Sequence, residues 1–196
     1  MRVIVATTNE GKLAEFRYLF KGYEVVSMSD IGYHGDIKEN GCTYLQNAYK
    51  KAKNIVDNVE LTDRDIVIAD DTGLEVEKLH GELGLYSARY MGYSTPYSEK
   101  NQSILKALEG VGLKERKARY VCGICVYMHG CYLEFEGVLE GYIGGKPLEG
   151  RKEAFDPIFY LDNDKSLDII SMEEKMSISH RAKAVDKVIN VMNRML

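Results

Sequence analysis

Long apolar runs are missing from this 196-residue sequence, and none reaches the about 18 residues of a membrane-spanning helix. The N-terminal stretch MRVIVATTN shows no signal-peptide pattern. A basic excess is missing as well, because 26 basic residues stand against 30 acidic ones and the net charge is −4. Proteins that bind nucleic acid usually carry such an excess. We therefore expect a cytoplasmic protein that binds neither membrane nor nucleic acid, although a local Lys and Arg cluster would suffice for a small anion.

Cysteine is scarce, and three of the four cysteines lie close to a histidine in the order Cys122, Cys125, His129, Cys131. This spacing superficially resembles a zinc knuckle. However, the run RYVCGICVYM, 119–128, is typical of a strand, in which residues three apart point to opposite faces. We therefore favour reduced structural thiols over a zinc site, in keeping with a reducing cytosol.

Repeats, low-complexity segments and clear linkers are also missing. The composition, 45% hydrophobic and 29% charged, is ordinary for a globular chain. The length suffices for one domain with a sizeable core, or for two lobes that share one sheet. We expect a single domain over residues 1–196.

The hydrophobic pattern along the chain is mixed α/β, with an antiparallel portion in the second half. Apolar residues at helical spacing predict helices over 10–20, 42–57, 96–109 and 180–194. Apolar or alternating stretches predict strands over 2–7, 23–28, 66–69, 119–128, 131–137, 138–143 and 154–161. His129-Gly130 is typical of a hairpin turn. Expected helix caps are Thr8 or Asn9, Thr95-Pro96 and Ser179.

Two adjacent carboxylates, Asp70 and Asp71, follow the apolar run 66–69 and precede Thr72-Gly73, which favours a turn. In a strand they face opposite sides, so at most one points into a given pocket. Mg²⁺ typically binds one or two carboxylates together with waters and phosphate oxygens. A carboxylate beside the metal can orient or deprotonate an attacking water. Glu39 could supply a second carboxylate, but from these residues alone an acid pair that caps a loop is equally consistent.

A second candidate is ATTNEGK, 6–12, where a strand ends and a helix begins. The first N–H groups of a helix are free and carry partial positive charge, which suits a phosphate, and Lys12 lies one turn in. The segment is not a Walker A loop. A simple capped helix is the alternative.

A third candidate is SISHRAKA, 177–184, where His180 and Arg181 fall in the first turn of a helix. Positive charge there opposes the helix dipole, which suggests that these residues serve an anionic or carbonyl-bearing ligand, with Lys175 just upstream. A solvated helix start is the alternative. Arg89 lies between apolar and aromatic residues, so we expect it to be paired with an acid or an anion.

Taken together and in this order, six segments resemble the inosine triphosphate pyrophosphatase family, also called XTP/dITP diphosphatases. These segments are ATTNEGK, GCTYLQNAYKKA, IADDTGLEV, LGLYSARY, FDPIF and EEKMSISHRAKA, and they span almost the whole chain. The resemblance implies hydrolysis of a nucleoside triphosphate, preferably XTP, ITP or dITP, to monophosphate and pyrophosphate. It also implies an elongated mixed β-sheet with flanking helices that form two lobes around a central nucleotide cleft, in a homodimer.

The resemblance further implies a role for each matching residue. Mg²⁺ is the expected cofactor, held by Glu39 and Asp71, and Asp71 also acts on the water as the catalytic residue. The expected substrate-binding residues are Thr7, Thr8, Asn9 and Lys12 at the triphosphate, Lys51 and Thr72 in support of the phosphates, and Phe155, Asp156, Lys175, His180 and Arg181 toward the base and sugar. Asp70 is expected to be structural.

The chain departs from the family pattern in one loop. Where the family has Phe-Gly-Tyr/Trp-Asp-Pro, this chain has Glu153, Ala154, Phe155, Asp156 and Pro157. The family's first aromatic stacks on the base, an interaction worth about 1–3 kcal/mol. Its replacement by Glu153 implies weaker nucleotide binding, by about tenfold or more, or a different base. Two alternatives to the purine pyrophosphatase therefore stay open: a pyrophosphatase with altered base specificity, and, independently of Glu153, a nucleotide-binding protein with little catalysis.

Overall fold

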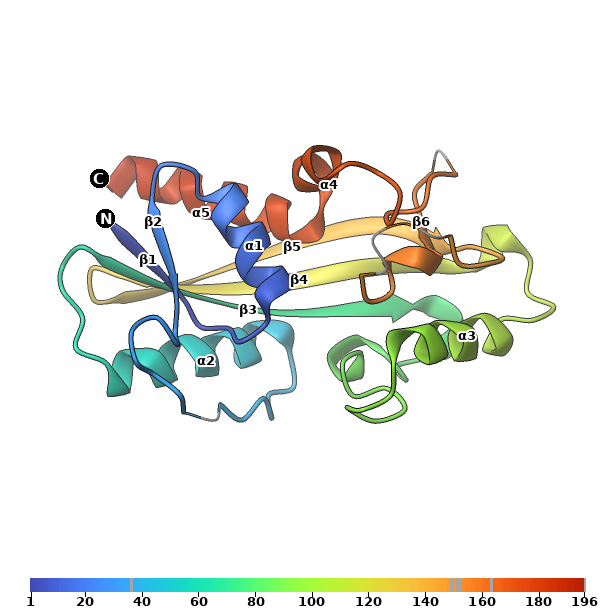
Figure 1. Cartoon of the computed structure of the whole chain (residues 1–196), viewed down its shortest axis with the longest axis horizontal. Coiled ribbons are helices and arrows are strands. Elements are labelled where there is room, and N and C mark those ends of the chain that lie inside the picture. Colours follow the sequence, from blue (N-terminus) through green and yellow to red (C-terminus); the bar gives the residue numbers. More distant parts are fainter. Residues whose placement is uncertain (36, 149, 151–152, 163, 196) are drawn as a thin grey trace. The chain divides into compact units, whose positions relative to one another are not determined.

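The structure, a computed structural model, describes residues 1–35, 37–148, 150, 153–162 and 164–195. Within these ranges, six strands form one sheet in the order β2-β1-β3-β4-β5-β6 (Figure 1). The strands are β1 (Arg2–Val5), β2 (Glu24–Ser27), β3 (Asp65–Val76), β4 (Lys117–Met128), β5 (Cys131–Ile143) and β6 (Phe159–Tyr160). The α-helices of the described residues are α1 (Glu10–Leu19), α2 (Tyr44–Asn58), α3 (Tyr97–Ala107), α4 (Met172–Ile178) and α5 (His180–Met195). The predicted mixed α/β class is confirmed.

The sheet combines parallel and antiparallel pairs. β1 runs parallel to both β2 and β3, and α1 and α2 supply the crossovers that parallel neighbours require. β4 and β5 are joined by a two-residue turn in which His129 and Gly130 have φ of 47° and 80°. Positive φ at both positions is the hairpin geometry that matches strand twist, so the predicted turn is confirmed. β6 pairs antiparallel with β5.

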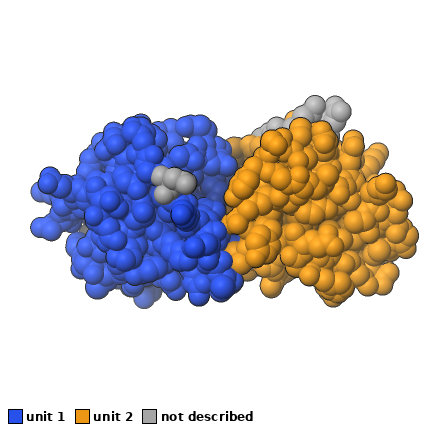
Figure 2. Space-filling view, turned by 90° about the horizontal axis from the view of Figure 1, so that it is seen from below, with its two compact units in different colours: residues 1–71, 122–137, 180–196 blue, residues 72–121, 138–179 orange. Residues whose placement is uncertain are grey.

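The chain forms two compact units, which Figure 2 shows in different colours. Unit 1 comprises residues 1–71, 122–137 and 180–196, and unit 2 comprises residues 72–121 and 138–179. In unit 1, Val3–Val5 of β1 and residues 65–71 of β3 are buried on both faces, as is usual where helices cover a parallel sheet. One apolar cluster joins Val3, Val5 and Ile68 to α1 and α5, whereas the other joins Ile4 and Val67 to α2. Figure 1 shows α1 and α5 on one side of the strands and α2 on the other.

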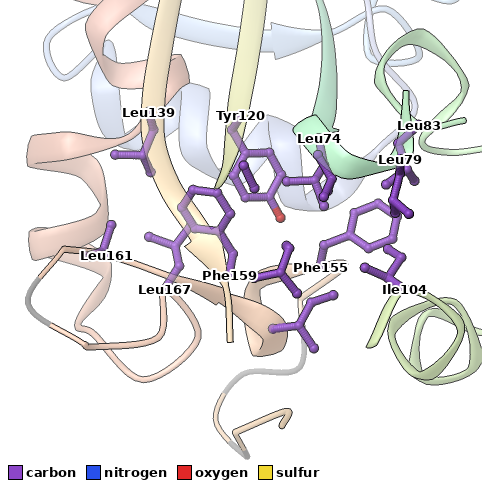
Figure 3. Packing of buried hydrophobic residues seen from close by; sticks show 14 of the residues in the cluster. Leu74, Leu79, Leu83, Ile104, Tyr120, Leu139, Phe155, Phe159, Leu161 and Leu167 are labelled. Carbon is purple, nitrogen blue, oxygen red and sulfur yellow. The ribbon is translucent and has the colours of Figure 1, made fainter. Parts of the chain in front are cut away.

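Unit 2 has its own apolar core, drawn in Figure 3. Tyr120 of β4 and Phe159 of β6 lie beside one another, with ring centroids 4.8 Å apart. The Phe155 ring meets Tyr97 of α3 edge-on at 5.1 Å. This packing holds the segment around residue 156 against β4.

Two expected elements are wrong. β3 does not end at 69 but continues to Val76, so no turn forms at Thr72-Gly73. The strand continues because Leu74 and Val76 are buried in the core of unit 2. The strand expected over 154–161 shrinks to β6, preceded by a short 3-10 turn, Asp156–Ile158. Pro157 lies in this turn and has no N–H to donate to a strand ladder.

Helix ends differ in smaller ways. Asn9 caps α1 by accepting a hydrogen bond from the Lys12 N–H, as expected. α3 begins at Tyr97 with Pro96 as its N-cap, so Thr95-Pro96 is not the expected cap and first turn. The sequence reasoning missed α4 altogether. Ser179 is the C-cap of α4 and directly precedes α5.

The cysteines of β4 lie on opposite faces, as the strand pattern predicts. Cys122 belongs to the cluster with α1 and α5, whereas Cys125 belongs to the cluster with α2. Burial raises the pKa of the Cys125 thiol to about 12. In the described part of the chain, His, Cys, Asp and Glu form no group of three or more that could hold a metal. No helix within that part is long and apolar enough to cross a membrane.

Candidate active site

β3 directs its two aspartates to opposite sides of the sheet, as expected. Asp70 lies among residues of α1 and α5, with the Cys122 thiol 3.9 Å from its Oδ2. Asp71 accepts a hydrogen bond from Asn47 Nδ2 of α2 at 2.7 Å. Strand alternation therefore separates two adjacent acids into different surroundings.

Asp70 is buried and neutralised by cations. Its Oδ2 lies 3.0 Å from Lys12 Nζ and 2.9 Å from Arg181 Nη2. Burial alone would raise the pKa of Asp70, but Lys12, Arg181 and Lys51 outweigh it and hold the pKa well below its usual range. Arg181 also pairs with Glu15 of α1. These contacts form an internal ion-pair network, which agrees with the structural role expected of Asp70.

Sequence reasoning missed Glu15, although the sequence carried a signal. Glu15 lies between Leu13 and Phe16, which face the core of unit 1, and it is itself only 7% exposed. A buried acid on the apolar side of a helix needs a cationic partner. Here that partner is Arg181, which comes from the far end of the chain.

Asp71 differs from Asp70 because burial dominates its titration. Burial raises the pKa of Asp71, while Lys51 and the Asn47 hydrogen bond oppose the rise. The negative charge of Glu39 raises the pKa of Asp71 further. A carboxylate with a raised pKa beside cationic partners is a common feature of reactive sites.

Asn47 and Lys51 lie one turn apart on the buried face of α2. Asn47 also accepts a hydrogen bond from the Gly41 N–H at 2.7 Å, so it links the loop before α2 to Asp71. Lys51 Nζ lies 2.5 Å from Glu39 Oε1, and the negative charges of Asp70, Glu39 and Asp71 outweigh burial and raise the pKa of Lys51. Asn47 was not predicted, although a polar side chain within an apolar helical stripe marks it.

The donor set at Asp71 fits Mg²⁺. Two carboxylates, Asp71 and Glu39, are close enough for the charge of Glu39 to raise the pKa of Asp71. Mg²⁺ needs only one or two carboxylates, because waters and phosphate oxygens complete its shell. Lys51 forms an ion pair with Glu39. A divalent cation bound by Asp71 and Glu39 would relieve the repulsion between these two acids.

The loop before α1 places Thr7, Thr8 and Asn9 at the helix start. Thr7 Oγ1 accepts a hydrogen bond from the Asn9 N–H at 3.1 Å, and Asn9 caps the helix. Thr8 and Asn9 are exposed, whereas Thr7 is half-buried. Thr72, in β3, is also half-buried. Their expected contacts with phosphate stay predictions.

The residues expected at the base and sugar end divide between the two units. Asp156 and Lys175 lie in unit 2, where Lys175 Nζ is 2.7 Å from Asp156 Oδ2. His180 and Arg181 begin α5 in unit 1, both buried, with Arg181 held by Asp70 and Glu15.

The Phe155 ring is only 3% exposed and belongs to the core of unit 2, so its expected contact with substrate stays a prediction. Arg89, expected to pair with an acid or an anion, lies half-buried with its guanidinium carbon 5.6 Å from the centre of the Tyr86 ring.

Comparisons with known proteins find relatives over nearly the whole chain. A model of the Ham1 family matches residues 3–191. A protein of Thermoanaerobacter pseudethanolicus named dITP/XTP pyrophosphatase is 45% identical, with 97% of this chain and 96% of its own covered. One of the same name from Bacillus subtilis is 38% identical, with 94% and 93% covered.

Solved structures give the same result. The Ham1 protein of Staphylococcus aureus matches with a TM-score of 0.86 and 31% identity, with both chains covered in full. A nucleoside-triphosphatase, dITP/XTP pyrophosphatase, of Mycobacterium abscessus matches with a TM-score of 0.74 and 30% identity, with 96% of this chain and 98% of that chain covered. Identity and coverage at these levels place the chain in the Ham1 family.

Proposed function

We propose that this chain is a Mg²⁺-dependent nucleoside triphosphate pyrophosphatase that hydrolyses dITP, ITP and XTP to monophosphate and pyrophosphate. The names of its relatives support the substrate class. The observation that carries the proposal is the Asp71 arrangement: a buried carboxylate with a raised pKa, fixed by Asn47 and flanked by Lys51 and Glu39. We further propose a cytoplasmic homodimer.

The chemistry requires a water molecule to attack the α-phosphorus while charge develops on the leaving pyrophosphate. Such transfers depend on positioning and charge neutralisation more than on covalent help. When bound, Mg²⁺ would neutralise phosphate oxygens and lower the pKa of a nearby water molecule. Asp71 orients the attacking water and accepts its proton, because Asn47 fixes the carboxylate. Lys51 and Lys12 bind phosphate oxygens, and Glu39 and Asp71 are the residues that would hold the metal.

The test is product analysis with the purified protein and MgCl₂ across ITP, dITP, XTP, GTP, ATP and dUTP. We expect pyrophosphate release to be fastest with the 6-oxopurines ITP, dITP and XTP. Asp71→Asn should lower kcat by at least about a hundredfold, the usual loss when a general base is removed. Glu60→Gln, at an exposed acid after α2, is the matched control. Equal activity in Asp71→Asn would refute the assigned role.

A further inference from the structure

A second buried charge cluster lies in unit 2, around Lys175 of α4. Lys175 Nζ lies 2.6 Å from Glu153 Oε2 and 2.7 Å from Asp156 Oδ2. The side chains of Lys175 and Asp156 are each 6% exposed, whereas that of Glu153 is 40% exposed. Glu153 is therefore the member of this trio that solvent or a ligand reaches most easily.

The two buried members are held by the fold. Asp156 Oδ1 accepts a hydrogen bond from the Tyr120 hydroxyl at 3.0 Å, and its carbonyl accepts one from Ser166 Oγ at 2.9 Å. Lys175 is carried by α4, which Ser171 caps. Burial raises the pKa of Asp156, while Lys175 opposes the rise. The ammonium thus has a fixed position, and the Glu153 carboxylate lies directly beside it.

An ammonium beside a carboxylate presents a donor next to an acceptor. Lysine carries only N–H donors and an ionised carboxylate only acceptors, so the pair matches a ligand edge on which an acceptor lies beside a donor. A 6-oxopurine carries the complementary edge, because its O6 accepts and the neighbouring N1–H donates. Adenine carries the reverse pattern, with a donor at C6 and an acceptor at N1, so both contacts would be mismatched.

We propose that Glu153 is a specificity-determining residue that accepts a hydrogen bond from the N1–H of a 6-oxopurine while Lys175 donates to O6. This inference rests on the proposed function and names the edge of the base that the Glu153–Lys175 pair reads. It also ranks the 6-oxopurines. Hypoxanthine has a plain C–H at C2, but xanthine has a carbonyl oxygen there, which would face the carboxylate. Glu153 therefore favours inosine over xanthosine nucleotides.

Two variants separate these contacts. Glu153→Gln keeps an acceptor and adds an N–H donor that suits the xanthine C2 oxygen, so the ratio of kcat/KM for ITP to that for XTP should fall about tenfold. Glu153→Ala removes the acceptor, so the ratio of ITP to ATP should fall about tenfold. Glu173→Gln, an exposed acid on the same helix, is the control and should leave both ratios unchanged. Circular dichroism checks that each variant is folded.

Binding gives a readout independent of turnover. Titration calorimetry with IMP, XMP and AMP should show the same changes in relative affinity. If the ITP/XTP ratio of Glu153→Gln and the ITP/ATP ratio of Glu153→Ala both stay within twofold of wild type, Glu153 does not read the base. It would then be only a surface partner of Lys175. If the wild-type protein hydrolyses none of the nucleotides, the proposed function fails, and the calorimetric ratios alone decide whether Glu153 reads the base.

Discussion

At the scale of single residues, two adjacent aspartates show how surroundings separate equal side chains. Asp70 faces Arg181 and Lys12, and its ionised form is strongly favoured. Asp71 is disfavoured as an anion because burial outweighs its partners. The Asp70 charge thus stabilises the fold, whereas the charge of its neighbour Asp71 is buried at a free-energy cost.

This contrast predicts that the same Asp→Asn substitution has very different effects on stability at the two positions. Asp70→Asn leaves Arg181 and Lys12 without their shared carboxylate, so we expect the free energy of unfolding to fall by about 3–5 kcal/mol. Asp71→Asn removes a charge that burial disfavours and keeps an acceptor for Asn47, so we expect a change below about 1 kcal/mol. Urea denaturation at pH 7 measures both. A similar loss in the two variants would contradict the division of roles.

Sequence reasoning found Asp70, Asp71, Glu39 and Lys51, but the group became a site only through the order of family-like segments. Periodicity shows that Lys51 shares a helix face with Ala48 and Ile55; it does not show which strand that face meets. Glu15 and Asn47 were missed because a residue's place on a helix does not show which distant residue it meets. Their partners, Arg181 and Asp71, lie 166 and 24 positions away in the sequence.

At the scale of elements, the helices with a clear apolar stripe were predicted to within a few residues, whereas β3 and α4 were not, for two different reasons. This strand was predicted to end at residue 69, because Thr72-Gly73 shortly after it favours a turn. The burial of Leu74 and Val76 overrides that local preference. α4 was missed because seven residues give too little periodicity to recognise. Local patterns report local preference, whereas tertiary burial decides where an element ends.

Glycines show where elements approach too closely for a side chain. A Cβ at Gly137 of β5 would lie 2.6 Å from Ala184 N and closer still to the His180 carbonyl, both in α5. The first turn of α5, which carries His180 and Arg181, therefore rests against the backbone of β5. Backbone atoms on both sides leave little room for adjustment.

We expect Gly137→Ala to lower the free energy of unfolding by about 1–3 kcal/mol, the usual cost of forcing extra volume into packed structure. Gly145→Ala is the matched control, because a Cβ there would meet only Leu113 at 4.0 Å and its φ is not positive. Thermal unfolding compares the two. An unchanged midpoint in Gly137→Ala would contradict the close contact of α5 with β5.

At the scale of the whole molecule, the net charge does not reveal a local cluster of cations. The net charge of −4 argues against binding a long polyanion, yet Lys12, Lys51 and Arg181 gather around two aspartates in unit 1. These cations are paired with acids in the structure. A bound triphosphate would form ion pairs with some of these cations in place of the acids. It would also add negative charge, which a divalent cation offsets. Metal and nucleotide should therefore stabilise the fold jointly rather than separately.

Ligand linkage makes this measurable, because a ligand at a hundredfold excess over its Kd stabilises the native state by about 2.7 kcal/mol. For a chain of this size, that corresponds to a rise in Tm of about 5–11 °C. We expect this rise with Mg²⁺ plus a non-hydrolysable ITP analogue, and a smaller one with either alone. Glu39→Gln should lose the Mg²⁺-dependent part, whereas Glu60→Gln should keep it. An equal rise in the presence of EDTA would mean that the nucleotide binds through lysine and arginine alone, and that Glu39 and Asp71 hold no metal.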